Sequence, residues 1–189
     1  IDMLIDLTIE VTPKLREKAL KNEKRSVGGH IGTHFDVMDK KFPLEYVKRD
    51  GIVFDVSSLE KKEIESNDID LTQIKPDMFV AFYSGHLEKT GYGTPEYFKD
   101  HPQLSKALID KLLEKSISII GIDFVGIRNM KEHTEMDQYC ADNGVFVVEN
   151  LCNLDKVLDN KRSVKFKVHT YPIKYSDMTG LPCRVVAEI

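Results

Sequence analysis

Residues 90–124 read "TGYGTPEYFKDHPQLSKALIDKLLEKSISIIGIDF", and this stretch decides the fold class. The glycines and proline near its start predict turns. Apolar residues at helical spacing then predict an amphipathic helix over about 104–115, and the β-branched run 117–124 predicts a strand. A turn, a helix and a strand in succession form an α/β unit, so we expect an α/β fold.

Further strands and helices surround this unit. The alternating stretch "MLIDLTIEV" (3–11) predicts a strand, and the polar segment 14–26 predicts either a short surface helix or a mobile loop. A helix over 131–142 is expected to stop at Asn143-Gly144. No repeat, low-complexity tract or linker composition interrupts the chain, so we expect a single domain (1–189) with a mixed, strand-rich sheet and flanking helices. Apolar runs predict the remaining strands at 51–59, 77–85, 145–149, 164–173 and 183–189.

Composition narrows the function class. With 189 residues and 41% hydrophobic residues, the chain is long enough to bury a sizeable core. The formal net charge is −4 and the basic residues are scattered among acids, so a nucleic-acid partner is not expected. Three widely spaced cysteines favour free thiols in the cytoplasm over a disulfide framework. No apolar run has the length of a membrane span and no secretory signal is visible, so no membrane partner is expected, although the chain begins at Ile1 and not at Met.

The stretch "GGHIGTHFD" (28–36) places two histidines and an aspartate close together among glycines. A helix here is disfavoured, because each glycine costs about 1 kcal/mol relative to alanine. In an extended segment His30, Gly32, His34 and Asp36 point to one face, and Gly32 would leave space for an ion and its water. Two imidazoles and a carboxylate suit Zn²⁺ or Mn²⁺ and leave coordination positions for water. The alternative is that these side chains form hydrogen bonds within a turn and bind no metal.

Several motifs together resemble those of the cyclase superfamily of metal-dependent hydrolases, which includes bacterial kynurenine formamidase and isatin hydrolase. "HIGTHFD" is similar to the family's H-x-G-T-H-x-D signature. The similarity extends in order along most of the chain through "MLIDLTIEV", "GIVFDVSSL", "TGYGTPEYFKDHPQLS", "IGIDF", "VVENLCNLDKV" and "YPIKYSDMTGLPCRVVAEI". The resemblance implies a swivelling β/β/α-type fold, a homodimer or homotetramer, and one or two Zn or Mn ions.

The resemblance also implies roles for particular residues. His30, His34 and Asp36 match the ligands of the first metal, and Glu149 matches a glutamate of the metal site. Two positions depart from the family, since Lys40 and Asp137 (with Gln138 beside it) stand where the family has histidines. Asp137 could replace a histidine ligand and shift the preference toward Mn²⁺ or Mg²⁺. A desolvated Lys40 with a depressed pKa could act as a proton shuttle. Otherwise Lys40 is a solvated surface lysine and Asp137 an ordinary helix carboxylate.

Other polar and aromatic residues are weaker candidates. His133 lies one helical turn before Asp137 and could be recruited as a ligand, but an exposed position is the simpler expectation. His86 follows the strand end "FYSG" and could line a pocket. Arg128 could pair with a substrate carboxylate. Phe35, Phe42 and Tyr83 could form an apolar wall.

These observations predict a metal-dependent hydrolase that cleaves the C–N bond of a small amide or cyclic amide. His30, His34 and Asp36 would hold the ion, with Glu149 and Asp137 as further ligands, and with Glu149 and Lys40 in proton transfer. The alternative is a divergent family member that has lost turnover and binds a small ligand or a metal. The two substituted histidine positions, Lys40 and Asp137, motivate that alternative.

Overall fold

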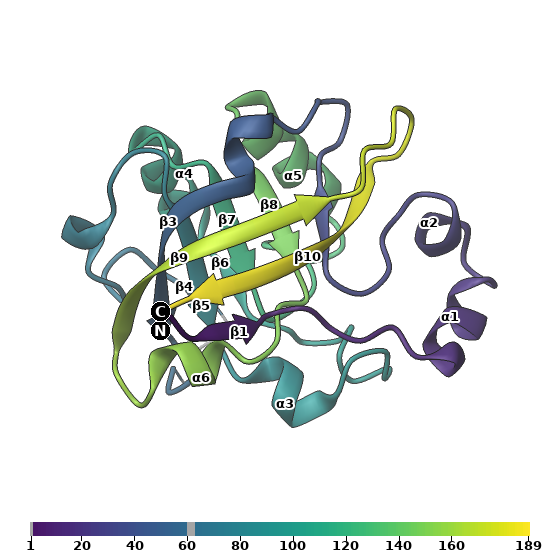
Figure 1. The fold of residues 1–189 in the computed structure, drawn as a ribbon, viewed down its shortest axis with the longest axis horizontal. Helices are drawn as coiled ribbons and strands as arrows, with labels where there is room; N and C mark the ends of the chain where they lie inside the picture. The colour runs from purple at the N-terminus through teal and green to yellow at the C-terminus, as the bar shows by residue number, and fades with distance from the viewer. Residues whose placement is uncertain (1, 60–62) are drawn as a thin grey trace.

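The computed structural model describes residues 2–59 and 63–189, which form a mixed α/β structure built on one large sheet (Figure 1). Two short 3-10 helices, Leu44–Val47 and Leu71–Gln73, accompany the regular elements. The strands and helices are β1 (Leu4–Asp6), α1 (Pro13–Ala19), α2 (Glu23–Ser26), β2 (His34–Asp36), β3 (Lys48–Asp55), β4 (Glu63–Ile64), β5 (Phe79–Tyr83), α3 (His86–Thr90), β6 (Gln103–Leu104), α4 (Lys106–Glu114), β7 (Ile119–Ile122), α5 (His133–Asp142), β8 (Phe146–Glu149), α6 (Leu154–Leu158), β9 (Ser163–Pro172) and β10 (Gly180–Glu188).

The large sheet curls back on itself. Its eight strands follow the order β1-β10-β2-β8-β7-β5-β3-β9, and β9 also pairs with β10. This extra pairing closes seven strands into a barrel, and β1 pairs with the end of β10 beyond the residues that contact β2. The strands β3, β5, β7 and β8 run parallel, whereas β2, β9 and β10 pair antiparallel to their neighbours. The expected fold class, a strand-rich mixed sheet with flanking helices, is confirmed.

Two apolar cores occupy the two faces of this sheet, because strand residues alternate between faces. Phe79 and Ala81 on β5 belong to the core inside the barrel. Val80 and Phe82 belong to the outer core, where α4 and α5 cover the sheet (Figure 1). Buried α4 residues, Leu108 among them, recur at helical spacing and pack on this outer face.

Most predicted elements are present with shifted boundaries. The strand expected over 3–11 is only Leu4–Asp6, with an isolated bridge from Thr8 to Leu151 further along. Segment 14–26 forms two short helices, α1 and α2, with a non-helical connection over 20–22. Thr12 caps α1, since its side chain accepts a hydrogen bond from the Leu15 N–H. No described helix is both long and apolar enough to cross a bilayer.

The position of β2 determines which residues meet at the outer face. Three-residue β2 lies between β8 and β10 and pairs antiparallel with both. Phe35, its middle residue, is fully buried inside the barrel, so His34 and Asp36 point to the opposite face. His34 stands directly across from Glu149 in the register with β8. Cross-strand partners share a face, so the two side chains meet beside α5.

Candidate metal centre

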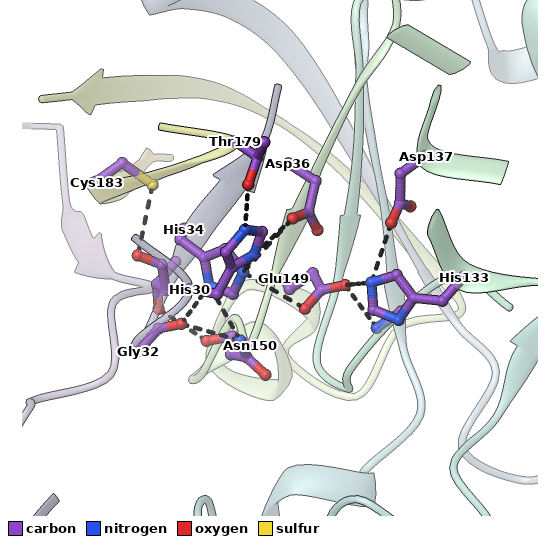
Figure 2. A network of polar contacts seen from close by, with 12 residues as sticks. His30, Gly32, His34, Asp36, His133, Asp137, Glu149, Asn150, Thr179 and Cys183 are labelled. Atoms are coloured by element: carbon purple, nitrogen blue, oxygen red, sulfur yellow. Dashed lines mark hydrogen bonds and ion pairs between the residues drawn. The ribbon is translucent and has the colours of Figure 1, made fainter. Parts of the chain in front are cut away.

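Six polar side chains converge on the outer face of the sheet where β2, β8 and α5 meet (Figure 2). All six are nearly inaccessible to solvent, with at most 9% of any residue exposed. Their ligand atoms form two groups, in each of which the atoms lie within 4.8 Å of one another, and Asp36 belongs to both. The first group is His30, His34 and Asp36, and the second is Asp36, His133, Asp137 and Glu149.

The first group brings two imidazole nitrogens beside one carboxylate. Nδ1 of His30 lies 2.9 Å from Oδ1 of Asp36 and 3.2 Å from Nε2 of His34. Nε2 of His34 lies 3.8 Å from the same Asp36 oxygen. Three potential ligand atoms from one heptapeptide segment therefore face a common point, as the spacing of the histidines and the aspartate predicts.

Hydrogen bonds on the far side of each ring hold the imidazoles in place. Nδ1 of His34 lies 2.9 Å from the Gly32 carbonyl oxygen, which can only accept, so this nitrogen carries the proton and Nε2 keeps its lone pair. Nε2 of His30 lies 2.9 Å from the Thr179 hydroxyl, which leaves Nδ1 toward Asp36. Metal-binding histidines in proteins have this arrangement, with one nitrogen free for the ion and the other hydrogen-bonded.

The backbone around His30 differs from the expected strand. Only His34–Asp36 is extended, and Gly29 and Gly32 have φ of +81° and +64°. A Cβ atom on Gly32 would lie 2.7 Å from Cγ2 of Val11, so this glycine makes a tight turn and does not provide space for an ion. His30 therefore reaches the group from a turn, and the prediction of one continuous strand is wrong.

The second group joins α5 to the end of β8. Nε2 of His133 lies 3.0 Å from Oδ2 of Asp137 and 3.3 Å from Oε1 of Glu149. Oε1 of Glu149 accepts a hydrogen bond of 2.7 Å from the Gly126 N–H, and its Oε2 lies 3.6 Å from Nε2 of His34. Glu149 thus stands between the two groups and contacts a histidine of each.

The charges of these groups are strongly perturbed. Burial lowers the pKa of His34 to about 4, so its imidazole is neutral. Burial alone would raise the pKa of Asp36, but its hydrogen bond to His30 and the nearby imidazoles hold that pKa below the ordinary value. Burial and the negative charges of Asp36 and Asp137 raise the pKa of Glu149 well above normal. Burial and Asp36 also raise the pKa of Asp137, to about 6.

Three buried carboxylate oxygens have no well-aligned donor. Among the described residues, none donates a hydrogen bond of good geometry to Oδ1 or Oδ2 of Asp36 or to Oδ1 of Asp137. A buried polar atom without a partner costs about 1–3 kcal/mol, and more for a charged group. A divalent cation would satisfy these oxygens and the imidazole nitrogens that face them. The donor set of imidazoles and carboxylates therefore suits Zn²⁺ or Mn²⁺.

Lys40 lies away from this arrangement. Its ammonium nitrogen is 2.7 Å from Asp142 and 3.3 Å from Asp39, and its side chain is 37% exposed. Hydrogen bonds to these two carboxylates raise the pKa of Lys40, which is opposite to the depressed pKa expected of a proton shuttle. Gln138, next to Asp137, donates to Asp39 and Asp142 at the same exposed surface.

The weaker substrate-binding candidates are engaged elsewhere. The Arg128 guanidinium binds the carboxylates of Glu63 and Glu132 and the Leu104 carbonyl. Phe35 is fully buried and packs against Phe42 inside the barrel. These side chains stabilise the fold in this structure and do not form an exposed apolar wall.

His133 is the site residue that sequence reasoning set aside. It is buried, and although burial alone would lower its pKa, the hydrogen bond to Asp137 raises it. The available signal was the four-residue spacing between His133 and Asp137, which places both on one face of a helix. That face could not be assigned without the packing of α5. His86, by contrast, contacts the Tyr97 carbonyl at 2.9 Å and belongs to neither group.

Two concave surface regions of the molecule do not coincide with this site. One concave surface region lies near the starts of β3 and β5, with Lys48, Lys75 and Phe166 in its wall. A second lies on α4 and α5, around Asp110 and Tyr139. Neither is lined by any of the six clustered side chains. The buried, mutually close ligand atoms identify the site instead.

Comparison with known proteins gives a consistent result. The profile of a family described as "Putative cyclase" matches residues 5–128. A search of curated protein sequences found no match. Among solved structures, one titled "The Structure Of Potential Metal-Dependent Hydrolase With Cyclase Activity" is similar over 100% of this chain and 98% of its own, with 19% identity and a TM-score of 0.76.

Two isatin hydrolases are also similar in fold. Isatin hydrolase A from Labrenzia aggregata, bound to benzyl benzoate, is 18% identical with a TM-score of 0.78, over 100% of this chain and 94% of its own. Isatin hydrolase A from Ralstonia solanacearum is 14% identical with a TM-score of 0.75, over 100% of this chain and 92% of its own. At these identities the comparison shows a shared fold.

Proposed function

Because the chain belongs to the cyclase family, we propose that residues 1–189 form a metal-dependent hydrolase that cleaves the C–N bond of a small linear or cyclic amide. The observation that carries this proposal is the convergence of three histidines and three carboxylates in two groups that share Asp36. Three carboxylate oxygens in the described part of these groups lack a well-aligned donor, as expected of metal ligands. Such a cluster is unfavourable in a folded protein unless an ion offsets its repulsion.

The first ion would be held by His30, His34 and Asp36. Asp36, His133, Asp137 and Glu149 would hold a second, and their excess of carboxylate oxygen favours Mn²⁺ over Zn²⁺ at that position. A divalent ion at these residues supplies Lewis-acid polarisation of a carbonyl and lowers the pKa of water.

Glu149 is the residue best placed to move a proton. Its Oε1 is occupied by the Gly126 N–H, whereas Oε2 faces His34. A carboxyl group fixed at one oxygen can accept a proton at the other and deliver it to a leaving amide nitrogen. In this proposal Glu149 acts as the acid and base, and Asp137 and His133 orient it. Lys40 is a weaker candidate for proton transfer, because its ammonium is paired with Asp142.

The substrate class is inferred from relatives of similar fold. The isatin hydrolases are named for isatin, whose ring contains an amide, and they match this chain along its whole length. A small cyclic amide or an N-formyl amide is therefore the first class to test. The partners we propose are this small molecule and further copies of the same chain, as a homodimer or homotetramer. The three free cysteines are consistent with the proposed cytoplasmic location.

The second candidate function is binding without turnover. It is favoured by Asp137, which stands where the family has a histidine, and by the pairing of Lys40 at the surface. In that case the cluster would still hold an ion, but no amide would be hydrolysed.

Metal content and turnover together distinguish the two functions. We would purify the protein without chelator, measure ions per chain by elemental analysis, and assay N-formyl and cyclic amides with added Zn²⁺ or Mn²⁺. His34→Ala should lose both metal and turnover. His169→Ala is a matched control, because His169 pairs with Glu188 outside both groups. Metal without turnover on any substrate would favour the binding function, and no metal after reconstitution would exclude both.

A further inference from the structure

We propose that Asn150 is a positioning residue that fixes the orientation and tautomer of His34 by clamping the carbonyl group of Gly32. This role rests on the metal-dependent function proposed above, because the lone pair of His34 matters only if it binds an ion. Asn150 does not belong to either ligand group and directly follows Glu149 in the chain. Its side chain is buried behind His34 (Figure 2).

The Gly32 carbonyl receives two hydrogen bonds. One comes from Nδ1 of His34 and the other from Nδ2 of Asn150, each 2.9 Å long. Gly32 lies in the left-handed region, where a glycine peptide can rotate at little cost. The Asn150 amide therefore holds this carbonyl where it can accept the His34 proton. If the carbonyl turned away, Nδ1 would lose its acceptor and the proton could move to Nε2, the atom that faces Asp36.

The orientation of the Asn150 amide is itself determined by its partners. The group facing the Gly32 carbonyl must be the NH₂, because two carbonyl oxygens would repel each other. Oδ1 then accepts a 2.6 Å hydrogen bond from the hydroxyl of Tyr97. Tyr97 is fully buried, and burial raises its pKa well above the ordinary value, so its hydroxyl stays a donor.

The backbone of Asn150 is fixed as well. Its carbonyl accepts a 2.7 Å hydrogen bond from the Thr33 hydroxyl, which in turn accepts from the Ile9 N–H at 2.9 Å. Asn150 has φ of +60°, a conformation that asparagine tolerates better than most side chains. The turn after β8 therefore places Glu149 in the cluster and, through the next residue, aligns His34 on β2.

The tautomer of His34 can be measured directly in metal-free protein. Long-range ¹H–¹⁵N spectra of the imidazole should show a single species protonated at Nδ1 in the wild type. Asn150→Gly removes the clamp without backbone strain, and we expect a mixture of tautomers or exchange between them. Tyr97→Phe should have a smaller effect in the same direction. Tyr46→Phe is the control, since it deletes a tyrosine hydrogen bond to the Gly144 carbonyl outside the cluster.

Metal affinity provides the second measurement. Residues that position a metal-binding histidine through hydrogen bonds typically change the metal affinity by about 10–100-fold. We therefore expect Asn150→Gly to weaken Zn²⁺ binding within that range. Tyr97→Phe should weaken it less, and Tyr46→Phe should leave it unchanged. A loss in all three variants would indicate general destabilisation and overturn the proposal.

The two measurements separate this inference from the proposed function. A single Nδ1-protonated tautomer in Asn150→Gly, with unchanged Zn²⁺ affinity, would overturn the positioning role while the metal function stands. If the wild type binds no metal, the proposed function fails and the positioning role for an ion fails with it. If Asn150→Gly does not fold, Tyr97→Phe decides, because it keeps the ring and removes only the hydroxyl. An unchanged tautomer and an unchanged affinity in that variant would then overturn the proposal.

Discussion

Nε2 of His133 lies 3.0 Å from Oδ2 of Asp137, four residues further along α5. One helix therefore brings an imidazole and a carboxylate to the same point, next to Glu149 at the end of β8. The family resemblance of the sequence implies a histidine at the position of Asp137. In this chain the imidazole lies one turn earlier, so the second ligand group still contains one nitrogen and several oxygens.

Removing His133 should affect one group and spare the other. In His133→Ala we expect the Zn²⁺ or Mn²⁺ ion at His30, His34 and Asp36 to remain. The second equivalent of metal, held by the group that contains His133, should be lost. Isothermal titration of metal into metal-free protein would give the stoichiometry. Glu135→Gln, an exposed change on the same helix, is the control. An unchanged stoichiometry in His133→Ala would show that α5 supplies no imidazole ligand.

Metal should stabilise the fold, and Asp36 should be required for it. A ligand at 100 times its Kd stabilises the folded state by about 2.7 kcal/mol, so the melting temperature should rise with Zn²⁺ and fall with a chelator. Asp36→Asn should abolish the rise, because Asp36 belongs to both groups. Calorimetry with and without Zn²⁺ measures this effect. Asp50→Asn changes only an exposed pair with Lys167 and should keep the full rise.

Asp123 should make stability depend on pH. It is buried, and burial raises its pKa from 3.8 to about 7 despite hydrogen bonds from Ser84 and Gly85. Between these values the folded state binds a proton that the unfolded state has released. The contribution of protonated Asp123 to the free energy of unfolding is therefore fully present below pH 3.8. It is lost as the pH rises through about 7.

Denaturant titrations at several pH values would test this dependence. The slope from one such group is at most about 1.4 kcal/mol per pH unit. In metal-free protein, Asp123→Asn should flatten the decline between pH 5 and 7 relative to the wild type. Equal slopes in the two proteins would mean that Asp123 is ionised throughout the range.

Lys40 is expected to be dispensable for metal binding. Its ammonium pairs with Asp39 and Asp142, and these contacts are exposed to solvent. Lys40→Met should therefore leave metal content and the unfolding midpoint unchanged, as measured by elemental analysis and denaturant titration. Turnover that collapses while metal content is preserved would instead support the proton-shuttle role.

Local sequence patterns predicted the sheet-forming segments and the grouping of His30, His34 and Asp36, whereas Asp137 and Glu149 were named from the family resemblance. The alternation at His34, Phe35 and Asp36 is a property of any strand, and it holds in the structure. Barrel closure was not predictable, because the pairing of β9 with β10 depends on the curvature of the whole sheet. The extended path preferred for this segment fails at Gly32, because the left-handed φ of this residue and the close approach of Val11 depend on tertiary packing.

The contacts of Asn150 were likewise not predictable from local sequence patterns. A Tyr97 hydroxyl, an asparagine amide and a glycine carbonyl lie far apart in the sequence, and only their packing makes them neighbours. Local rules indicate which residue types can bind a metal. They do not indicate which polar groups stand behind those residues.

The placement of β2 between β8 and β10 sets the order of events during synthesis of the chain. Residues 30–36 precede both neighbouring strands of β2 in the chain, so β2 stays unpaired until β8 and β10 have been made. Thr179, which contacts His30, precedes β10 directly. If these residues bind a metal as proposed, a nascent chain would expose the binding peptide before the complete site exists, and loading with metal would follow the synthesis of β10.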